Sequence, residues 1–200
     1  MPVTGETAIG RAVQRGGVAA FEEWLGGVSG NFVVHAPPLA GTTRFVDTVG
    51  RRRPGTTLLV AATMGVARTP PSAIESVASV VDCSPTESGS TGAVASPGDL
   101  TGAAMPATEF LTSTDRPVLA VDSLSTFLYY ADEAAVFRFL NVVSAHVRRW
   151  DGLGLFVMTP GAHDDRTVHT YTQVVDGRIE LERDRVRVDA TDAPDGWHDR

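Results

Sequence analysis

The sequence contains no lysine, and all 17 of its basic residues are arginines. Chemistry that depends on a lysine ammonium, such as a Schiff base or the phosphate-binding lysine of a standard P-loop, is therefore excluded for this chain. Cysteine is nearly absent, and the single Cys83 excludes both an internal disulfide and a zinc site built on cysteines. No apolar run approaches the roughly 18 residues of a membrane helix, and no secretory signal pattern opens the chain. We expect a cytoplasmic protein without membrane contact.

Positive charge is also scarce, because the formal net charge is −7 and basic residues cluster only at Arg51–Arg53 and Arg148–Arg149. Direct nucleic-acid binding, which depends on neutralised phosphates, is not expected. What the sequence does contain is typical of a globular protein: 200 residues, of which 42% are hydrophobic and 20% charged. This length and composition predict one domain with a sizeable core.

Short apolar segments alternate with helical patterns along most of the chain. We expect strands over residues 31–36, 56–62, 79–82, 117–121 and 153–158, and helices over residues 44–53, 72–78, 99–111 and 132–150. Residues 168–188 then alternate like paired strands, with Asp176-Gly177 as the turn between them. This order predicts an α/β fold with a mostly parallel central sheet flanked by helices and antiparallel strands at the C-terminal edge.

The pattern divides the chain into three parts. Residues 1–28 form an N-terminal helical lead-in, residues 29–188 the domain, and residues 189–200 a polar tail that we expect to be frayed. Within the domain, residues 83–98 are rich in Ser, Thr, Gly and Pro and show no periodicity, which indicates a mobile surface loop.

The first candidate site is the turn after the first predicted strand, because ligands of such sheets bind at the carboxyl ends of the strands. Its residues are Ala36, Pro37, Pro38, Leu39, Ala40, Gly41, Thr42 and Thr43. Against the P-loop pattern G-x-x-x-x-G-K-[ST], Ala36 stands at the first glycine and Gly41 matches the second. Thr42 replaces the lysine, and Thr43 matches the hydroxyl that holds magnesium. The alternative is an ordinary strand-turn-helix connection without a ligand.

The second candidate is Asp122, which follows the buried strand predicted over residues 117–121. An acidic residue at the tip of such a strand is typical of a carboxylate that orients magnesium in P-loop ATPases. The alternative is that Asp122 and Ser123 cap the next helix.

Other polar groups favour ordinary structural roles. His163, Asp164 and Asp165 with His169 do not match the spacing of a known metal site, so a solvated loop is favoured. Ser123 and Ser125 lack a G-x-S-x-G context and a clear His/Asp partner, which disfavours a hydrolase triad. The arginines at 51–53 end a predicted helix, where cations complement the helix dipole.

Four segments together resemble the RecA/KaiC-type ATPase superfamily, specifically the small haloarchaeal KaiC/GvpD-like proteins of unknown function. In family order they are residues 32–43, 81–84, 121–128 and 175–181. The resemblance spans about residues 30–182 and implies a RecA-like P-loop fold. It also implies ATP or ADP at the loop of residues 36–43, with Mg²⁺ at Asp122 and Thr43.

Two departures from that family bear on function. Active members carry a lysine where this chain has Thr42, and usually a catalytic glutamate at the end of the strand that here reads Ala61-Ala62-Thr63-Met64-Gly65. Losing the charge clamp and the water-orienting base lowers phosphoryl transfer by orders of magnitude. We therefore assign no catalytic residue and expect no efficient ATP hydrolysis.

The sequence thus predicts a non-catalytic, pseudo-ATPase regulatory or scaffolding protein that binds nucleotide weakly, if at all. The resemblance implies a signalling or transcription-associated role, together with a protein partner or a homo-oligomer. Two alternatives stay open: a slow ATP-hydrolysing enzyme completed by a partner subunit, and a pure protein-interaction module.

Overall fold

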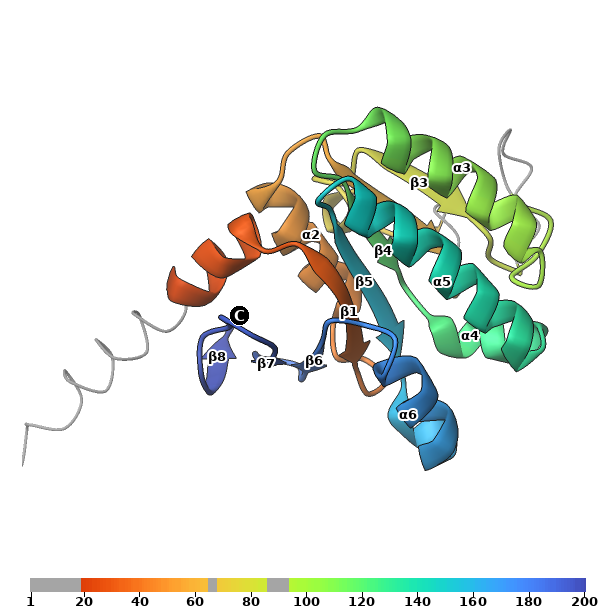
Figure 1. Ribbon diagram of the computed structural model, residues 1–200. Helices are drawn as coiled ribbons and strands as arrows, with labels where there is room; N and C mark the ends of the chain where they lie inside the picture. Colours follow the sequence, from red (N-terminus) through yellow and green to blue (C-terminus); the bar gives the residue numbers. More distant parts are fainter. Residues whose placement is uncertain (1–18, 65–67, 86–93) are drawn as a thin grey trace, which may run out of the picture.

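The computed structural model describes residues 19–64, 68–85 and 94–200. An eight-stranded sheet in the order β3-β2-β4-β5-β1-β6-β7-β8 forms the middle layer, and helices cover both of its faces (Figure 1). The strands are β1 Gly30–His35, β2 Thr57–Ala61, β3 Ser79–Asp82, β4 Val118–Val121, β5 Leu153–Met158, β6 Gly177–Leu181, β7 Arg185–Asp189 and β8 Trp197–Asp199. The helices are α2 Thr42–Arg52, α3 Leu100–Ser113, α4 Leu124–Tyr130, α5 Glu133–Arg149 and α6 Asp165–Thr172, with 3-10 turns at η2 Pro71–Ala73 and η3 Pro160–Ala162.

The first six strands in the sheet order, β3, β2, β4, β5, β1 and β6, run parallel to one another. Strands β7 and β8 then continue the sheet in antiparallel pairing. This confirms the predicted α/β architecture, including the antiparallel C-terminal edge. The central strands are buried on both faces, which explains why they are continuous apolar runs instead of alternating ones.

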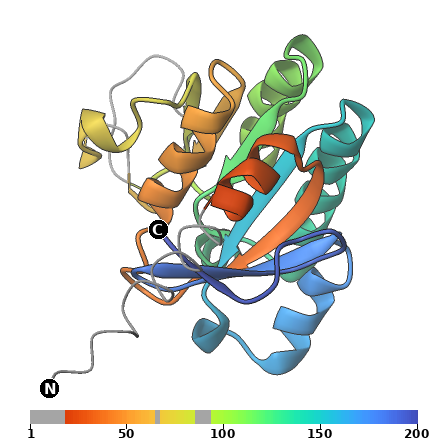
Figure 2. The same cartoon turned by 90° about the vertical axis from the view of Figure 1, so that its left-hand side faces the viewer.

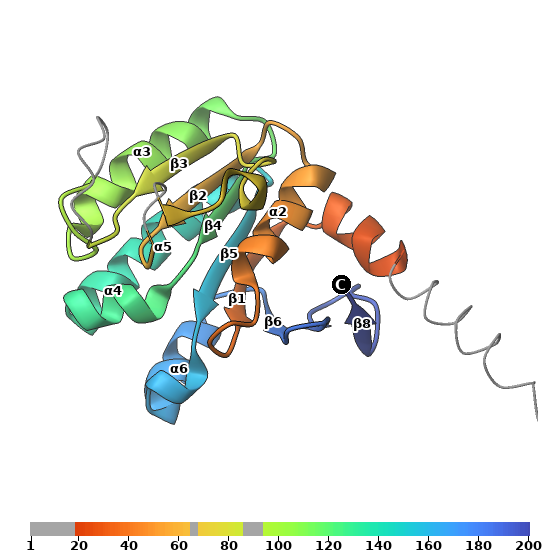
Figure 3. The same cartoon turned by 180° about the vertical axis from the view of Figure 1, so that it is seen from behind.

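Two separate layers of core side chains lie on the two faces of the sheet. Val33 of β1 packs with the layer under α3 and α5, whereas its neighbours Phe32 and Val34 pack with the layer under α2. Figure 1 shows α3, α4 and α5 in front of the sheet, and the reverse view in Figure 3 shows α2 in front of it. The helix over residues 19–27 lies on the α2 side and contributes Phe21 and Leu25. The other predicted lead-in residues, 1–18, lie outside the described part of the chain.

Buried polar groups fasten the edges of these layers. The Arg53 guanidinium is buried and donates from Nε to the Leu25 carbonyl oxygen at 3.0 Å, and a second nitrogen donates to the carbonyl of Val28. Arg53 therefore joins the end of α2 to the end of the helix over residues 19–27, a role in addition to the interaction with the helix dipole that the sequence predicts.

Cys83, directly after β3, is completely buried in the core layer under α3.

Three expected elements are wrong. The helix expected over residues 72–78 is reduced to η2, because Pro70 and Pro71 begin the segment and the Ser76 hydroxyl is held by the Asp47 carboxylate at 2.7 Å. The first strand expected after residue 168 is α6, where the Asp164 carboxylate caps the Thr167 N–H at 2.8 Å. Asp176-Gly177 is not a hairpin turn, since Gly177 begins β6 beside β1 and the turn lies at residues 182–184.

The end of the chain is also not frayed, because residues 197–199 pair with β7 as β8. Of the predicted loop over residues 83–98, residues 86–93 lie outside the described part, so its mobility stays a prediction. Among the helices that the structure describes, none combines the length and apolar character needed to cross a lipid bilayer.

Candidate functional site

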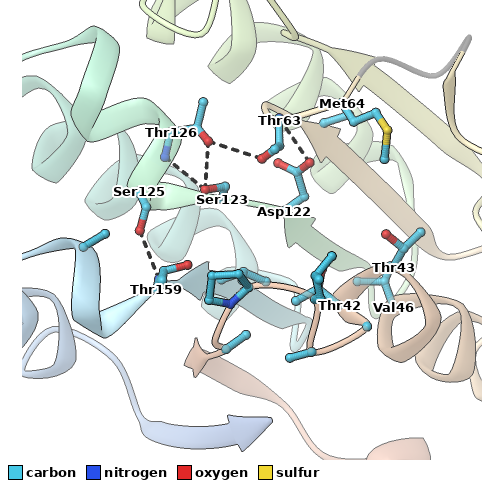
Figure 4. Close-up of a pocket in the computed structure, with 18 of the residues that line it drawn as sticks. Thr42, Thr43, Val46, Thr63, Met64, Asp122, Ser123, Ser125, Thr126 and Thr159 are labelled. Atoms are coloured by element: carbon cyan, nitrogen blue, oxygen red, sulfur yellow. Dashed lines mark hydrogen bonds between the residues drawn. The ribbon is translucent and has the colours of Figure 1, made fainter. Parts of the chain in front are cut away.

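A cavity of about 800 Å³ opens where β1, β2, β4 and β5 end. Its walls are the loop of residues 36–43, the turn after β2, Asp122 and Ser123 after β4, one side of α4 and Thr159 after β5 (Figure 4). All of the residues singled out from the sequence, Ala36–Thr43 and Asp122, line this one cavity. Parallel strands present their carboxyl ends at the same edge of a sheet. This arrangement brings the loop of residues 36–43 close to Asp122, although the two are about 80 residues apart in the sequence.

Several backbone donors of the loop over residues 36–43 are missing or already paired. Pro37 and Pro38 have no backbone N–H, and the Ala40 N–H donates to the Pro37 carbonyl at 3.1 Å. Gly41 adopts a left-handed conformation with φ 79° directly before α2, and no side chain caps the first turn of that helix. Backbone N–H groups at such a start lack partners within the helix and favour negative charge.

Asp122 is held by the neighbouring strand end. One of its carboxylate oxygens accepts the Ala62 N–H at 2.7 Å and the other accepts the Thr63 N–H at 3.2 Å. Burial raises the pKa of Asp122 to about 6, with a further contribution from the negative charge of Asp82, although the two N–H groups act in the opposite direction. Among the described residues no hydrogen bond joins Asp122 to Thr43. Asp122 therefore fastens β4 to the turn after β2, which sequence reasoning did not predict.

Ser123, and not Asp122, caps the next helix: its hydroxyl accepts the Thr126 N–H at 3.0 Å. Hydroxyl groups continue from there, with 2.9 Å between the Oγ atoms of Ser123 and Thr126 and 3.2 Å from Thr126 Oγ1 to Thr63 Oγ1 (Figure 4). A row of hydroxyls therefore lies beside Asp122, able to donate or accept hydrogen bonds.

Ser125 has a partner that the sequence did not reveal. Its Oγ accepts the Thr159 N–H at 3.0 Å and lies 2.8 Å from Nε2 of His163. No carboxylate hydrogen-bonds His163 in the described ranges, so the pair lacks the third member of a triad. The contact joins α4 to the segment after β5. His169 lies elsewhere and bonds to Gln173, and no three potential metal ligands in the described part gather around one point.

The charge of the cavity is its most informative property. The described residues that line it include one carboxylate, that of Asp122, and no arginine or histidine. Arg200 hydrogen-bonds the loop: its guanidinium donates to the carbonyl oxygens of Ala40 and Gly41 at 2.9 Å and of Glu182 at 3.0 Å. Arg200 thus supports the loop from outside the cavity, where the end of the chain passes beside it (Figure 2).

Comparison with known proteins supports the fold. The chain is similar to the flagellar accessory protein FlaH from Methanocaldococcus jannaschii, with a TM-score of 0.57 and 9% sequence identity over 89% of this chain and 87% of that one. FlaH has a RecA-like fold, and the same fold is therefore assigned to this chain. A sequence profile described as "Family of unknown function (DUF7504)" matches residues 30–181. No curated protein matches the sequence.

Proposed function

The chain belongs to the DUF7504 family of unknown function, and we propose that it is a non-catalytic, KaiC-like regulatory or scaffolding protein with a RecA-like fold. The observation that carries this proposal is the charge of the cavity. Phosphoryl transfer needs cations that neutralise the charge developing on the transferred group. Among the described residues that line this cavity there is one carboxylate and no cationic side chain.

The positions that perform chemistry in active relatives support the same conclusion. Thr42 stands where the loop lysine is needed, and the turn after β2 offers the Ala62 and Thr63 backbone to Asp122 instead of a carboxylate to water. Magnesium-bound ATP or ADP fits poorly, since Asp122 is the single charged side chain among the described residues that line the cavity. Any nucleotide is held weakly, by the N–H groups at the start of α2 and by Thr43.

Exposed apolar side chains at the mouth of the cavity favour a second candidate, a pure protein-interaction module. Leu39 is 96% exposed and Tyr129 84% exposed, and both lie at the mouth of the cavity. Nothing among the described lining residues supports the slow ATPase completed by a partner subunit. Signalling or transcription-associated regulation has the KaiC-like resemblance as its support.

The test is calorimetric titration of ATP and ADP with Mg²⁺, in low and in molar salt, together with a sensitive hydrolysis assay. We expect weak or undetectable binding and no turnover. Thr42→Lys should tighten ATP binding about 10- to 100-fold, because a charge-assisted hydrogen bond contributes about 1.5–3 kcal/mol. Thr42→Gln, of similar length but uncharged, is the matched control and should not tighten binding. Steady-state hydrolysis by the natural chain that Asp122→Ala abolishes would show an enzyme and overturn the proposal.

A further inference from the structure

Exposed apolar side chains gather at the mouth of the cavity. In the described part of the chain seven large hydrophobic residues are exposed, and four of them line this cavity. We call these four, Leu39, Met64, Tyr129 and Tyr130, the apolar rim. They come from three separate segments: the loop after β1, the turn after β2 and the end of α4. Apolar residues that converge in this way on one concave surface mark an interaction site more often than a surface exposed to water alone.

The members of the apolar rim suit contact with a protein. Tyr and Met are among the residue types enriched in interfaces, and Tyr is frequent among those that dominate binding energy. The rings of Tyr129 and Tyr130 lie edge to face with their centres 5.3 Å apart, which presents a broad aromatic surface. Leu39 has φ 65°, a left-handed conformation that Gly or Asn adopts more easily. Its side chain contributes little to the fold at 96% exposure.

The floor of the cavity specifies the charge of the partner. Asp122 accepts one N–H on each carboxylate oxygen, and the Thr63 side chain also hydrogen-bonds this carboxylate. A carboxylate has about four acceptor positions, so about one more is open. The start of α2 contributes about half a positive charge, which is smaller than the full negative charge of an ionised Asp122. Ser123, Thr63 and Thr126 add hydroxyl oxygens. A guanidinium or ammonium group complements this floor, and an anion does not.

We propose that the cavity docks a protein partner through a segment that places one arginine or lysine side chain against Asp122 and apolar side chains on the apolar rim. This inference rests on the proposed non-catalytic function and names the kind of partner that the scaffold binds. The cavity of about 800 Å³ lies within the range of about 300–1,000 Å³ that binding pockets occupy, so it holds more than one side chain of such a segment.

The experiment selects random 12-residue displayed peptides on the folded full chain, then measures the consensus peptide by fluorescence anisotropy. We expect selected peptides to carry an Arg or Lys with an apolar residue within two positions. Replacing that basic residue by Gln in the peptide should weaken binding about tenfold. Tyr129→Ser should weaken it at least fivefold, whereas Met105→Ser, at another exposed apolar residue that lies on α3 outside the cavity, should leave it within twofold.

Asp122→Asn provides the decisive comparison. In this variant the Arg and Gln peptides should bind equally, while Asp115→Asn, at an exposed carboxylate remote from the cavity, should preserve the tenfold difference. If Asp122→Asn does not fold by circular dichroism, Leu39→Ser and Tyr129→Ser carry the test.

Selected peptides without basic residues would overturn the proposal. A difference in affinity between the Arg and Gln peptides that persists in Asp122→Asn would also overturn it. So would self-association of the chain that Tyr129→Ser abolishes, because the occupant would then be a second copy. ATP turnover would instead overturn the proposed function, so the two failures are distinct.

Discussion

The start of α2 differs from the starts of the four other α-helices whose bounds the structure gives. Those four begin with a side chain that accepts a backbone N–H three residues further on, the caps being Asp99, Ser123, Asp132 and Asp164. Helix α2 begins with Gly41 in a left-handed conformation and has no such cap. The uncapped start of α2 lines the cavity, as does the start of α4, which Ser123 caps.

The start of α2 and the rest of the cavity favour ligands of opposite charge. An uncapped helix start leaves N–H groups available to an anion, as in P-loops and dinucleotide-binding turns. The rest of the cavity has the opposite charge, since Asp122 lines it and Arg200 serves the loop carbonyls from outside. The start of α2 therefore offers backbone N–H groups, but the described lining residues include no cationic side chain that would bind a polyanion tightly.

The largest effect that we expect concerns Asp122, which satisfies N–H groups of a turn as the caps do at the helices. Its pKa is about 6 in the folded protein, against 3.8 when unfolded. The folded state therefore holds the proton of Asp122 to a higher pH than the unfolded state does. The contribution of this group to the free energy of unfolding is most favourable below pH 3.8 and is lost as the pH rises through 6. Compared with Asp122→Asn, the natural chain should lose up to about 3 kcal/mol of stability between pH 3.5 and pH 7.

Urea unfolding of both proteins across that pH range measures the effect. The difference between the two curves isolates Asp122 from Asp47, Asp164 and Glu182, whose lowered pKa values act in the opposite direction. A difference that stays constant with pH would mean that Asp122 is ionised in the folded state without penalty.

The next largest effect that we expect is a difference in stability loss between substitutions at the capped start of α5 and at the uncapped start of α2. Asp132→Ala removes the acceptor 2.7 Å from the Ala135 N–H at the start of α5 and should lower the free energy of unfolding by about 1 kcal/mol. Thr42→Ala at the start of α2 should change it by less than about 0.5 kcal/mol, because no side chain caps that end. Equal losses in urea unfolding would contradict the difference between the two helix starts.

The smallest effect concerns the support of the loop from outside. Arg200→Ala removes hydrogen bonds to three carbonyl oxygens but leaves a partly exposed site that water can enter, so we expect a loss of less than about 1 kcal/mol. Amide hydrogen exchange over residues 39–44 should become faster. Arg149→Ala, at an exposed arginine at the end of α5, is the control and should leave that exchange unchanged. Unaltered exchange in Arg200→Ala would show that the loop is rigid without this support.

Much of the central architecture could be predicted from the sequence, because it depends on local patterns. Buried parallel strands are continuous apolar runs, and helix starts such as Asp99 and Asp132 carry recognisable caps. The convergence of the loop and Asp122 followed from the rule that ligands bind at the carboxyl ends of parallel strands. Their roles in nucleotide binding remain predictions.

What could not be predicted depends on distant contacts. The sequence from residue 168 alternates like a strand, but the structure forms helix α6 there. The Asp164 cap fixes it as a helix, and buried Tyr171, whose hydroxyl donates to the Glu133 carbonyl at 3.0 Å, anchors it. The bond from Ser125 to His163 spans 38 residues, and that from Arg200 to Ala40 spans 160. Neither segment of such a pair contains a signal that predicts the contact. The sequence therefore indicates a frayed tail over residues 189–200 and no partner for Ser125, and both expectations are wrong.

The burial of Cys83 has a practical consequence. Its thiol is completely buried, and burial raises its pKa to about 12, so almost no reactive thiolate exists while the strand edge is closed. Because the chain has one cysteine, every alkylation event comes from this position. A thiol-labelling time course on the unaltered protein therefore reports how often the core around β3 opens, without an engineered probe.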